Sequence, residues 1–414
     1  MRISRRTLLA ASIALAAAPA SAKTRRAFAR TQAFLQAYVD ATKLPGAMVG
    51  IQPRRGPPIH LAAGRISFEP DAPAIGPLSI GRVFSMTKPV TALTAMSLID
   101  SGLLRLDQPI AEILPAFANP RVLVDAKTME TRPASGPITV RHLMTHTAGL
   151  GYAIDRSSPL APLYFKQGLN PGARTPTQGE GAWPANLQAF ADRLAAAPLQ
   201  SDPGARWAYS VSLDLLAAVI EKAAGAPFEA VVRTRITDPL GMKDTGFVVP
   251  AADVPRFISA VGVSSSGVTT VDPAATSSFL RPTPYPSGGG GLVSTVADFN
   301  RLGAMLLNDG ALEGRRVLSR KSMALVRSNL APAGATAEAR GHGFSAGMRY
   351  VTSQSATAGE ELPGSIGWGG AAGTTFWVDQ ASGVAVTFMA QFFPSDAYPT
   401  ASEVRRAFYA DWRI

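Results

Sequence analysis

The tetrad Ser85-Met86-Thr87-Lys88 constrains this chain more than any other feature. It begins a segment, Ser85 to Ile99, whose apolar residues recur at helical spacing, and Gly102 follows as a typical C-terminal cap. Residues three apart share one face of a helix, so the Ser85 hydroxyl and the Lys88 amine are expected to meet. The tetrad therefore predicts a helix whose first turn presents both groups together, near backbone amides that favour negative charge.

The chemistry of this pair points to a nucleophile and its base. A serine hydroxyl attacks well only when a neighbouring base takes its proton. A lysine amine acts as that base where its surroundings lower its pKa, whereas an arginine keeps its proton. Only 8 of the 40 Lys and Arg residues are lysines, and of these Lys88 alone follows a serine by three residues. The plain alternative is a chance S-x-x-K on a solvated helix face, because short motifs recur by accident.

Residues 1–22 are typical of an export signal that is cleaved from the mature protein. Arg5-Arg6 precede an apolar run from Leu8 to Ala18, and Ala20-Ser21-Ala22 offers small residues for cleavage. The pattern resembles a twin-arginine signal, and the apolar run is too short for the alternative, a permanent membrane anchor. We therefore expect a periplasmic or secreted protein of residues 23–414, without a stable anchor after cleavage.

Composition excludes several classes of function. Removing the leader takes away three arginines and no acid, so the formal net charge falls from +11 to +8. This basic charge forms no stripe interleaved with aromatic residues, so we expect no nucleic-acid partner. The chain has no cysteine, which excludes disulfides and a thiolate nucleophile. No G-x-G-x-x-G or P-loop follows a predicted strand, so we expect no nucleotide and no other cofactor.

Strand-like runs lie at both ends of the chain, with helical patterns between them. This order predicts an α/β (α+β) fold in which an antiparallel sheet, built from both chain ends, is flanked by helices. A mostly helical subdomain, about 103–285, is expected to be inserted between an α/β part of 23–102 and 286–414. The predicted strands and C-terminal helix are Gly46–Ile51, Pro58–Gly64, Thr374–Val378, Val384–Met389 and Glu403–Trp412.

Two helices and a loop are predicted in the middle of the chain. Tyr209 to Ala224 reads as one helix closed by Gly225, and Ala251 to Ser287 as loop. Thr295 opens another helix, with Asp298 in a capping arrangement.

Two segments besides the tetrad carry groups suited to chemistry. Tyr209 precedes a helical pattern, and a phenol near a serine and a lysine can shuttle a proton, although a lone tyrosine is more often half-buried and structural. The run Gly364 to Gly373 precedes the C-terminal hairpin. Its backbone N–H groups could stabilise an oxyanion, and the alternative is a plain glycine-rich turn.

At this point the chain resembles the serine β-lactamase/penicillin-binding superfamily, in the class C-like branch that includes the family VIII carboxylesterases. One such block is a weak signal, but the matching blocks come in the order typical of the family and span most of residues 40 to 390. They are Ser85-Met86-Thr87-Lys88-Pro89-Val90, Gly102–Pro109, Leu143–Leu150, Tyr209-Ser210, Pro239–Met242, Gly289–Thr295 and Trp368-Gly369-Gly370.

The resemblance implies a role for each matching residue. Ser85 would be the acylated nucleophile, with Lys88 and Tyr209 as proton-transfer partners, either of which can be the base. The oxyanion hole would use the N–H groups of Ser85 and of Ala371. Ala371 follows the substrate-binding triplet Trp368-Gly369-Gly370.

Two departures from the β-lactamase pattern bear on the substrate. Val211 stands where that pattern has the asparagine of Tyr-x-Asn, and Trp368-Gly369-Gly370 stands in place of Lys-Thr-Gly. An uncharged wall suits an ester without a free acid, since losing a charge-assisted hydrogen bond costs an anionic substrate roughly 1.5–3 kcal/mol. Trp-Gly-Gly resembles the family VIII form, so esterase is preferred, with Arg349 as the cation that would compensate if it reaches the site.

Two other motifs are expected to be structural. Gly343-Phe344-Ser345-Ala346-Gly347 fits the G-x-S-x-G elbow, but the polar residues before it do not read as a strand and Met348 to Ser353 looks extended. His142 and His146 are spaced like a helical zinc pair, yet Leu143 stands where that motif has glutamate and no third ligand stands out. We therefore expect Ser345 to be structural and no metal to be bound.

Three functions follow from these residues. The preferred one is a serine hydrolase, a carboxylesterase acting on small esters through an acyl-Ser85 enzyme. The second is a class C-like β-lactamase or D-alanyl carboxypeptidase/penicillin-binding protein. The third is a β-lactam- or peptidoglycan-binding module without turnover. The expected partner in each case is a small molecule, an ester or a β-lactam-like compound, and the sequence assigns no oligomeric state.

Overall fold

A computed structural model describes residues 22–172, 178–335, 341–352 and 361–412. The predicted export signal lies outside the described residues except for Ala22, which begins the short helix α2, Ala22–Ala27. Within the described ranges, no helix has both the length and the apolar character needed to cross a membrane.

The centre of the fold is a seven-stranded sheet in the order β11-β12-β13-β14-β15-β1-β2, with antiparallel neighbours throughout. The N-terminal and C-terminal strands form one sheet, because β1 pairs with β15, with Val49 opposite Phe388, and β2 pairs with β1 at the edge. The predicted sheet from both chain ends is therefore confirmed. The strands are β1 Gly46–Pro53, β2 Ile59–Gly64, β11 His342–Phe344, β12 Arg349–Val351, β13 Ile366–Gly370, β14 Thr374–Asp379 and β15 Val384–Met389.

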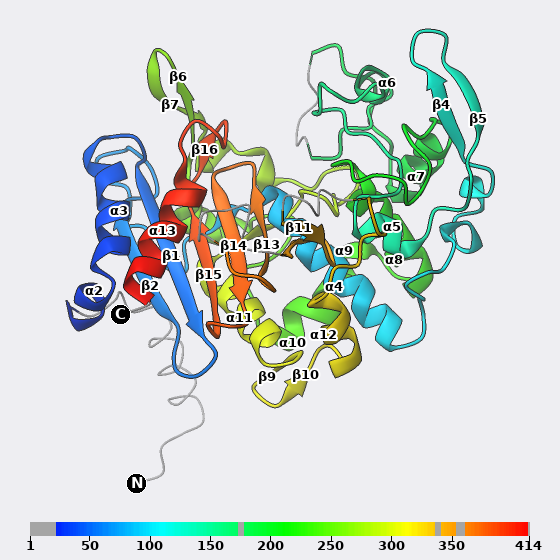
Figure 1. The fold of residues 1–414 in the computed structure, drawn as a ribbon. Coiled ribbons are helices and arrows are strands. Elements are labelled where there is room, and N and C mark those ends of the chain that lie inside the picture. Colours follow the sequence, from blue (N-terminus) through cyan, green and yellow to red (C-terminus); the bar gives the residue numbers. More distant parts are fainter. Residues whose placement is uncertain (1–21, 173–177, 336–340, 353–360, 413–414) are drawn as a thin grey trace.

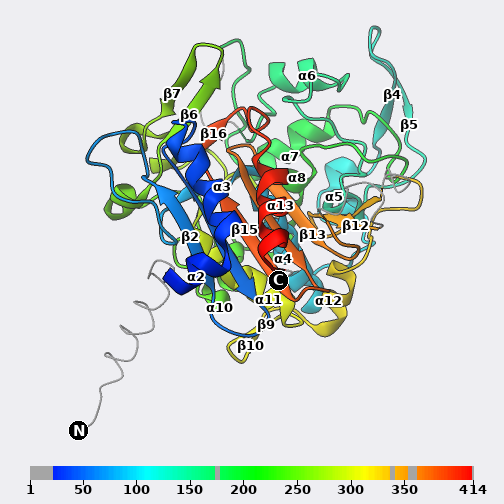
Figure 2. The same ribbon diagram turned by 60° about the vertical axis from the view of Figure 1, so that its left-hand side comes forward.

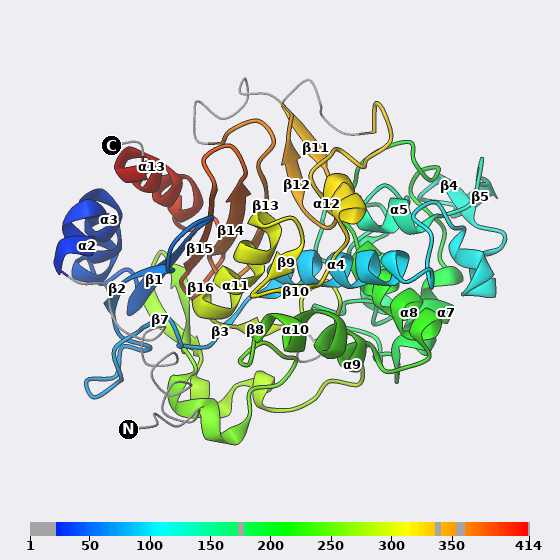
Figure 3. The same cartoon turned by 90° about the horizontal axis from the view of Figure 1, so that it is seen from below.

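Helices cover both faces of this sheet (Figures 2 and 3). The N-terminal helix α3, Ala29–Asp40, and the C-terminal helix α13, Thr400–Trp412, lie side by side on one face. Helix α11, Val296–Leu307, packs on the other face against β1 and β15. Every residue of β14 and β15 is buried, as expected for strands covered on both sides.

A mostly helical region adjoins the sheet, on the right of Figure 1. Helix α4, Thr87–Asp100, lies between the two parts, and residues 87 to 98 are all buried. This surrounds the helix with protein and excludes the solvated face that was the plain alternative for the S-x-x-K tetrad. The remaining helices are α5 Val140–Met144, α6 Ala161–Lys166, α7 Leu187–Ala195, α8 Ser212–Ala224, α9 Phe228–Val232, α10 Asp238–Leu240 and α12 Arg320–Val326.

The prediction of loop for residues 251–287 is wrong. Strands β6, Ala260–Ser264, and β7, Gly267–Asp272, form a hairpin there, and β6 also pairs with β16, Phe392–Phe393. No residue of β7 is buried, so the apolar alternation that marks a strand is missing from its sequence. The hairpin bears on the site, because Asp272 accepts a hydrogen bond at 2.7 Å from the buried Arg82, just before Ser85.

Smaller differences concern the ends and joins of elements. Helix α8 begins at Ser212 rather than at Tyr209, and Gly225 closes it in the left-handed conformation as expected. The Thr295 side chain caps α11 by accepting a hydrogen bond from the Asp298 N–H, also as expected. The subdomain limits at 103 and 285 stay a prediction. Short strand pairs complete the fold: β3 Gly81–Arg82 with β8 Val293–Ser294, β4 Arg121–Asp125 with β5 Glu130–Pro133, and β9 Ala311–Leu312 with β10 Arg315–Arg316.

Candidate active site

Ser85 lies in a tight 3₁₀ turn, Phe84–Met86, that leads directly into α4. Phe84 has a φ of 41°, in the left-handed region that a bulky residue rarely adopts. The rings of Phe279 and Phe393 pack edge-on against the Phe84 ring, with centroids 5.7 and 5.6 Å away. These contacts hold the strained residue in place, and strain next to a reactive side chain is a common mark of functional sites.

Lys88 lies beneath Ser85 and is fully buried. Its Nζ donates to Ser85 Oγ at 3.2 Å and to the Gly289 carbonyl at 2.7 Å. The same Nζ lies 4.6 Å from the centre of the Tyr209 ring. The helical spacing of the tetrad thus brings the two groups into hydrogen-bond contact inside the protein.

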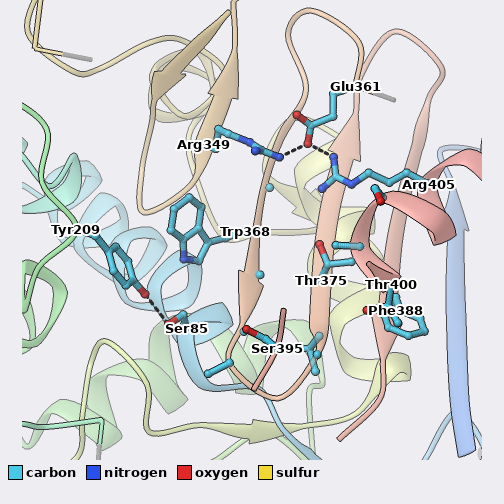
Figure 4. Close-up of a pocket in the computed structure, with 18 of the residues that line it drawn as sticks. Ser85, Tyr209, Arg349, Glu361, Trp368, Thr375, Phe388, Ser395, Thr400 and Arg405 are labelled. Carbon is cyan, nitrogen blue, oxygen red and sulfur yellow. Dashed lines mark hydrogen bonds and ion pairs between the residues drawn. The ribbon is translucent and has the colours of Figure 1, made fainter. Parts of the chain in front are cut away.

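Tyr209 reaches the same hydroxyl from the loop before α8. Its Oη and Ser85 Oγ share a hydrogen bond of 2.5 Å (Figure 4). The phenol ring is packed by other aromatic side chains, among them His146 at 5.0 Å, Tyr152 at 5.3 Å and Trp368 at 5.7 Å between ring centres. Ser85 therefore contacts an amine and a phenol, whose positions are fixed by packing.

Strand β13 supplies one wall of a pocket of about 560 Å³ that contains Ser85 and Tyr209. Trp368, Gly369, Gly370 and Ala371 all line it. A side chain on Gly370 would overlap the Val83 carbonyl and the Thr374 hydroxyl, so glycine lets this strand approach the turn that carries Ser85. The structure thus gathers every residue predicted for the site around one pocket, with Lys88 directly behind it.

The far end of the pocket carries two arginines that share one carboxylate. Arg349 and Arg405 line the pocket, and both bind Glu361 Oε1 (Figure 4). Burial lowers the pKa of Arg349 from its ordinary value. Arg349 therefore does reach the pocket, but its guanidinium is engaged by an internal carboxylate.

The family of this chain follows from a match to a protein-family model. A family model described as Beta-lactamase matches residues 31–410. This chain belongs to the beta-lactamase family. The resemblance expected from the sequence motifs is therefore confirmed.

Individual relatives within and around the beta-lactamase family include enzymes that act on esters or transfer acyl groups. The chain is 31% identical to Esterase EstB of Burkholderia gladioli over 412 residues, which covers 93% of this chain and 97% of that protein. It is 27% identical to Acyltransferase calJ of Penicillium decumbens over 80% of each protein. Its fold is similar to the solved structure of EstCE1, described as a hydrolase with promiscuous acyltransferase activity. The TM-score is 0.76 at 26% identity, and the match covers 93% of this chain and 99% of that one.

The G-x-S-x-G segment of this beta-lactamase-family chain is buried in the protein. Ser345 is fully buried and donates to the Val326 carbonyl at 2.5 Å. Strand β11 does precede Ser345, contrary to expectation, because His342 to Phe344 pair with β12. The polar stretch that argued against a strand was 338–342, of which 338–340 lie outside the described residues. Strand β12, not a helix, follows, so the G-x-S-x-G segment lacks the strand–turn–helix context of the elbow.

His142 and His146 face different partners. His142 Nδ1 accepts from the Thr139 N–H at 3.2 Å as part of a capping box at the start of α5. His146 Nδ1 shares a hydrogen bond of 3.0 Å with Ser210 Oγ, and its ring packs on Tyr209. Burial lowers the pKa of both rings. No group of three or more His, Cys, Asp or Glu that could hold a metal occurs in the part of the chain that the structure describes.

Three features of the site were not expected from the sequence. These are the strained Phe84, the Gly289 carbonyl that accepts from Lys88, and the buried Asp214 that binds the Gly289 N–H at 2.9 Å. The run Gly289-Gly290-Gly291 was a usable signal, since consecutive glycines mark a close approach of backbone to other groups. The sequence offered no signal for Asp214, because an aspartate in the first turn of a helix is commonly an ordinary N-terminal charge.

Proposed function

We propose that this chain is a serine hydrolase that cleaves small carboxylic esters through an acyl enzyme on Ser85. The observation that carries the proposal is the contact of one hydroxyl with both Lys88 and Tyr209 at the wall of an open pocket. A hydroxyl within hydrogen-bond reach of a proton acceptor is the arrangement that activates serine as a nucleophile. The similarity to Esterase EstB and to EstCE1 supports the same reaction.

In this mechanism Ser85 Oγ attacks the carbonyl carbon of the ester while its proton passes to the Lys88/Tyr209 pair. The carbonyl electrons move onto oxygen, where the N–H groups of Ser85 and Ala371 would stabilise the negative charge. Collapse of this intermediate expels the alcohol, which takes the proton back. Water then attacks the acyl-Ser85 ester, with its proton again held by the pair, and releases the acid and the free hydroxyl.

The lining of the pocket favours a neutral ester over a β-lactam. Trp368 packs against the Tyr209 ring in the position where the β-lactamase pattern has lysine, and Val211 is fully buried. Arg349 is bound to Glu361, so a substrate carboxylate would compete with an internal anion for this cation. The second hypothesis for the function is therefore cleavage of a β-lactam or a D-alanyl peptide. The third is capture of a ligand without turnover.

Transfer of the acyl group to an alcohol is a variant of the same reaction. The acceptor of acyl-Ser85 is then an alcohol rather than water, and the chemistry is otherwise unchanged. Exposed Ile154 and half-buried Trp368 line the pocket with Ser85 and offer apolar surface for the carbon part of such an alcohol. The names of Acyltransferase calJ and EstCE1 support including this variant.

The deciding experiment compares substrates and two serine variants. We expect the purified protein to hydrolyse p-nitrophenyl acetate or butyrate, Ser85→Ala to abolish this, and Ser345→Ala to retain it. Ester hydrolysis that survives Ser85→Ala would overturn the assignment. Nitrocefin should turn over much more slowly than the ester, and comparable kcat/KM values would return the β-lactamase reading to first place. Adding an alcohol and quantifying the new ester measures the transfer variant.

We also propose that residues 1–22 direct export in the folded state and are then removed. The support is the sequence Arg5-Arg6 before an apolar run and small residues. In a host with a twin-arginine export system, mass spectrometry of the exported protein should find Lys23 or a near neighbour as its first residue. Arg5→Lys combined with Arg6→Lys should leave the full-length chain in the cytoplasm, and unchanged export of that variant would contradict the proposal.

A further inference from the structure

A buried carboxylate lies behind the proposed catalytic residues and takes no part in the mechanism above. Asp214, in the first turn of α8, is fully buried. Its Oδ1 accepts from Ser287 Oγ at 2.6 Å and from the Gly289 N–H at 2.9 Å. Its Oδ2 has no hydrogen-bond partner among the described residues. Burying a carboxylate in this way is costly unless a nearby positive charge compensates it.

Gly289 links this carboxylate to the proposed nucleophile. Its N–H donates to Asp214, and its carbonyl accepts from Lys88 Nζ at 2.7 Å. A side chain at Gly289 would overlap Asp214 Oδ2, so only glycine lets the carboxylate approach this closely. The preceding carbonyl, of Gly288, accepts from Thr91 Oγ1 on α4 at 2.7 Å, which ties the glycine loop to the helix that carries Lys88.

The charges around the pair are few. Lys88 faces the rings of Tyr209 and Tyr152, and its charge adds to burial in lowering the pKa of His146. Asp214 faces Lys88, Tyr152 and Tyr285. Burial raises the pKa of both of these phenols above its ordinary value, so they stay neutral near pH 7. Burial also raises the pKa of Asp214, while the charge of Lys88 acts to lower it.

We propose that Asp214 is a positioning residue that acts through Gly289 and Lys88, an inference that rests on the proposed acyl transfer at Ser85. Asp214 holds the Gly289 backbone so that its carbonyl fixes the Lys88 amine beside the Ser85 hydroxyl. Replacing Asp214 should therefore displace the amine that takes the Ser85 proton.

The test is the pH profile of kcat/KM for p-nitrophenyl butyrate in Asp214→Asn, which has the same shape without the charge. We expect the plateau to fall by about 10- to 100-fold through misplacement of the amine. We expect the loss to appear in kcat, with KM within about 3-fold of wild type, because the pocket that holds the ester is unchanged. A wild-type kcat would overturn the proposal.

Two further variants keep the result interpretable. Asp298→Asn is the matched control, since Asp298 is also a buried carboxylate in the first turn of a helix, α11, where it binds Thr245 instead. It should keep the wild-type profile, and an equal loss there would assign the effect to general destabilisation. Ser287→Ala removes one hydrogen bond of Asp214 and leaves the one from the Gly289 N–H, so it should lower the plateau slightly.

The Ser287→Ala variant also covers a failure of Asp214→Asn to fold. In that case a wild-type plateau in Ser287→Ala would count against the proposal. Ser85→Ala is measured in parallel. If Ser85→Ala keeps the activity, the proposed function itself fails. If Ser85→Ala is inactive and Asp214→Asn behaves as wild type, only the role of Asp214 fails.

Discussion

At the scale of single residues, Trp368 packs against Tyr209, which shares a hydrogen bond with Ser85. Its ring packs against Tyr209, with centroids 5.7 Å apart, and edge-on against Phe344 at 5.2 Å. We predict that Trp368→Ala lowers kcat/KM for p-nitrophenyl butyrate about 10-fold, because small displacements of a catalytic group are costly. Trp368→Phe should stay within about 3-fold of wild type, since it keeps an aromatic contact. Equal activities of the two variants would contradict this role.

Some contacts of Ser85 can be predicted from the sequence alone and others cannot. The meeting of Ser85 and Lys88 follows from helix geometry, because the spacing of three residues is local. Tyr209 and the glycine-rich run that contains Ala371 were candidates from their own segments. Their placement beside Ser85 came from the family resemblance, since no local pattern relates residues so far apart along the chain. The engagement of Arg349 by Glu361 could not be predicted, because it depends on strand register and on the placing of α13.

Among elements, strand β13 determines how closely the pocket wall approaches the turn of Ser85. A Cβ at Gly370 would overlap the Val83 carbonyl, whereas a Cβ at Gly369 would meet only the Thr374 carbonyl, at 3.3 Å. We predict that Gly370→Ala lowers the free energy of unfolding by about 1–3 kcal/mol, the usual cost of overpacking. Gly369→Ala should change it by less than about 0.5 kcal/mol. Urea denaturation measures both, and equal losses would show that the close approach at Gly370 does not matter.

The elements that sequence predicted best are those with strong apolar runs. Strands β1, β14 and β15 and helix α13 lie close to their expected bounds, because burial on a defined face leaves a clear pattern. The hairpin of β6 and β7 was missed because most of its side chains are not buried, so only its backbone pairing identifies it. A buried strand leaves an apolar pattern in the sequence, whereas an exposed strand does not and is therefore hard to predict.

At the scale of the whole molecule, the four histidines connect stability to pH. Burial is the first cause that lowers the pKa of His60, His142, His146 and His342, and that of His60 falls to about 4. In the unfolded chain these histidines have an ordinary pKa near 6.5, so below that pH the unfolded chain binds protons that the folded chain does not bind. The free energy of unfolding is therefore not reduced by these histidines above pH 6.5, and it decreases as the pH falls toward 4. Burial raises the pKa of Asp298 to about 7, so protonation of Asp298 increases the free energy of unfolding as the pH falls over the same range.

His60 isolates this effect, because its ring is buried and meets Asn300 Nδ2 at 3.1 Å across β2 and α11. We predict that lowering the pH from 6.5 to 4.5 destabilises the wild type by roughly 2 kcal/mol more than His60→Gln. Urea denaturation at the two pH values provides the comparison. His342→Gln is the control and should differ less, since that side chain is 28% exposed. Parallel losses in wild type and His60→Gln would contradict the prediction.

The pairing of β1 with β15 also bears on when the protein can begin to work. A ribosome makes Ser85 and Lys88 early, but it makes Trp368 and the strand partner of β1 only near the end of synthesis. A nascent chain therefore holds a nucleophile without its opposing wall. We therefore expect a polypeptide that ends before β13 to lack esterase activity, because the pocket wall opposite Ser85 has not yet been made.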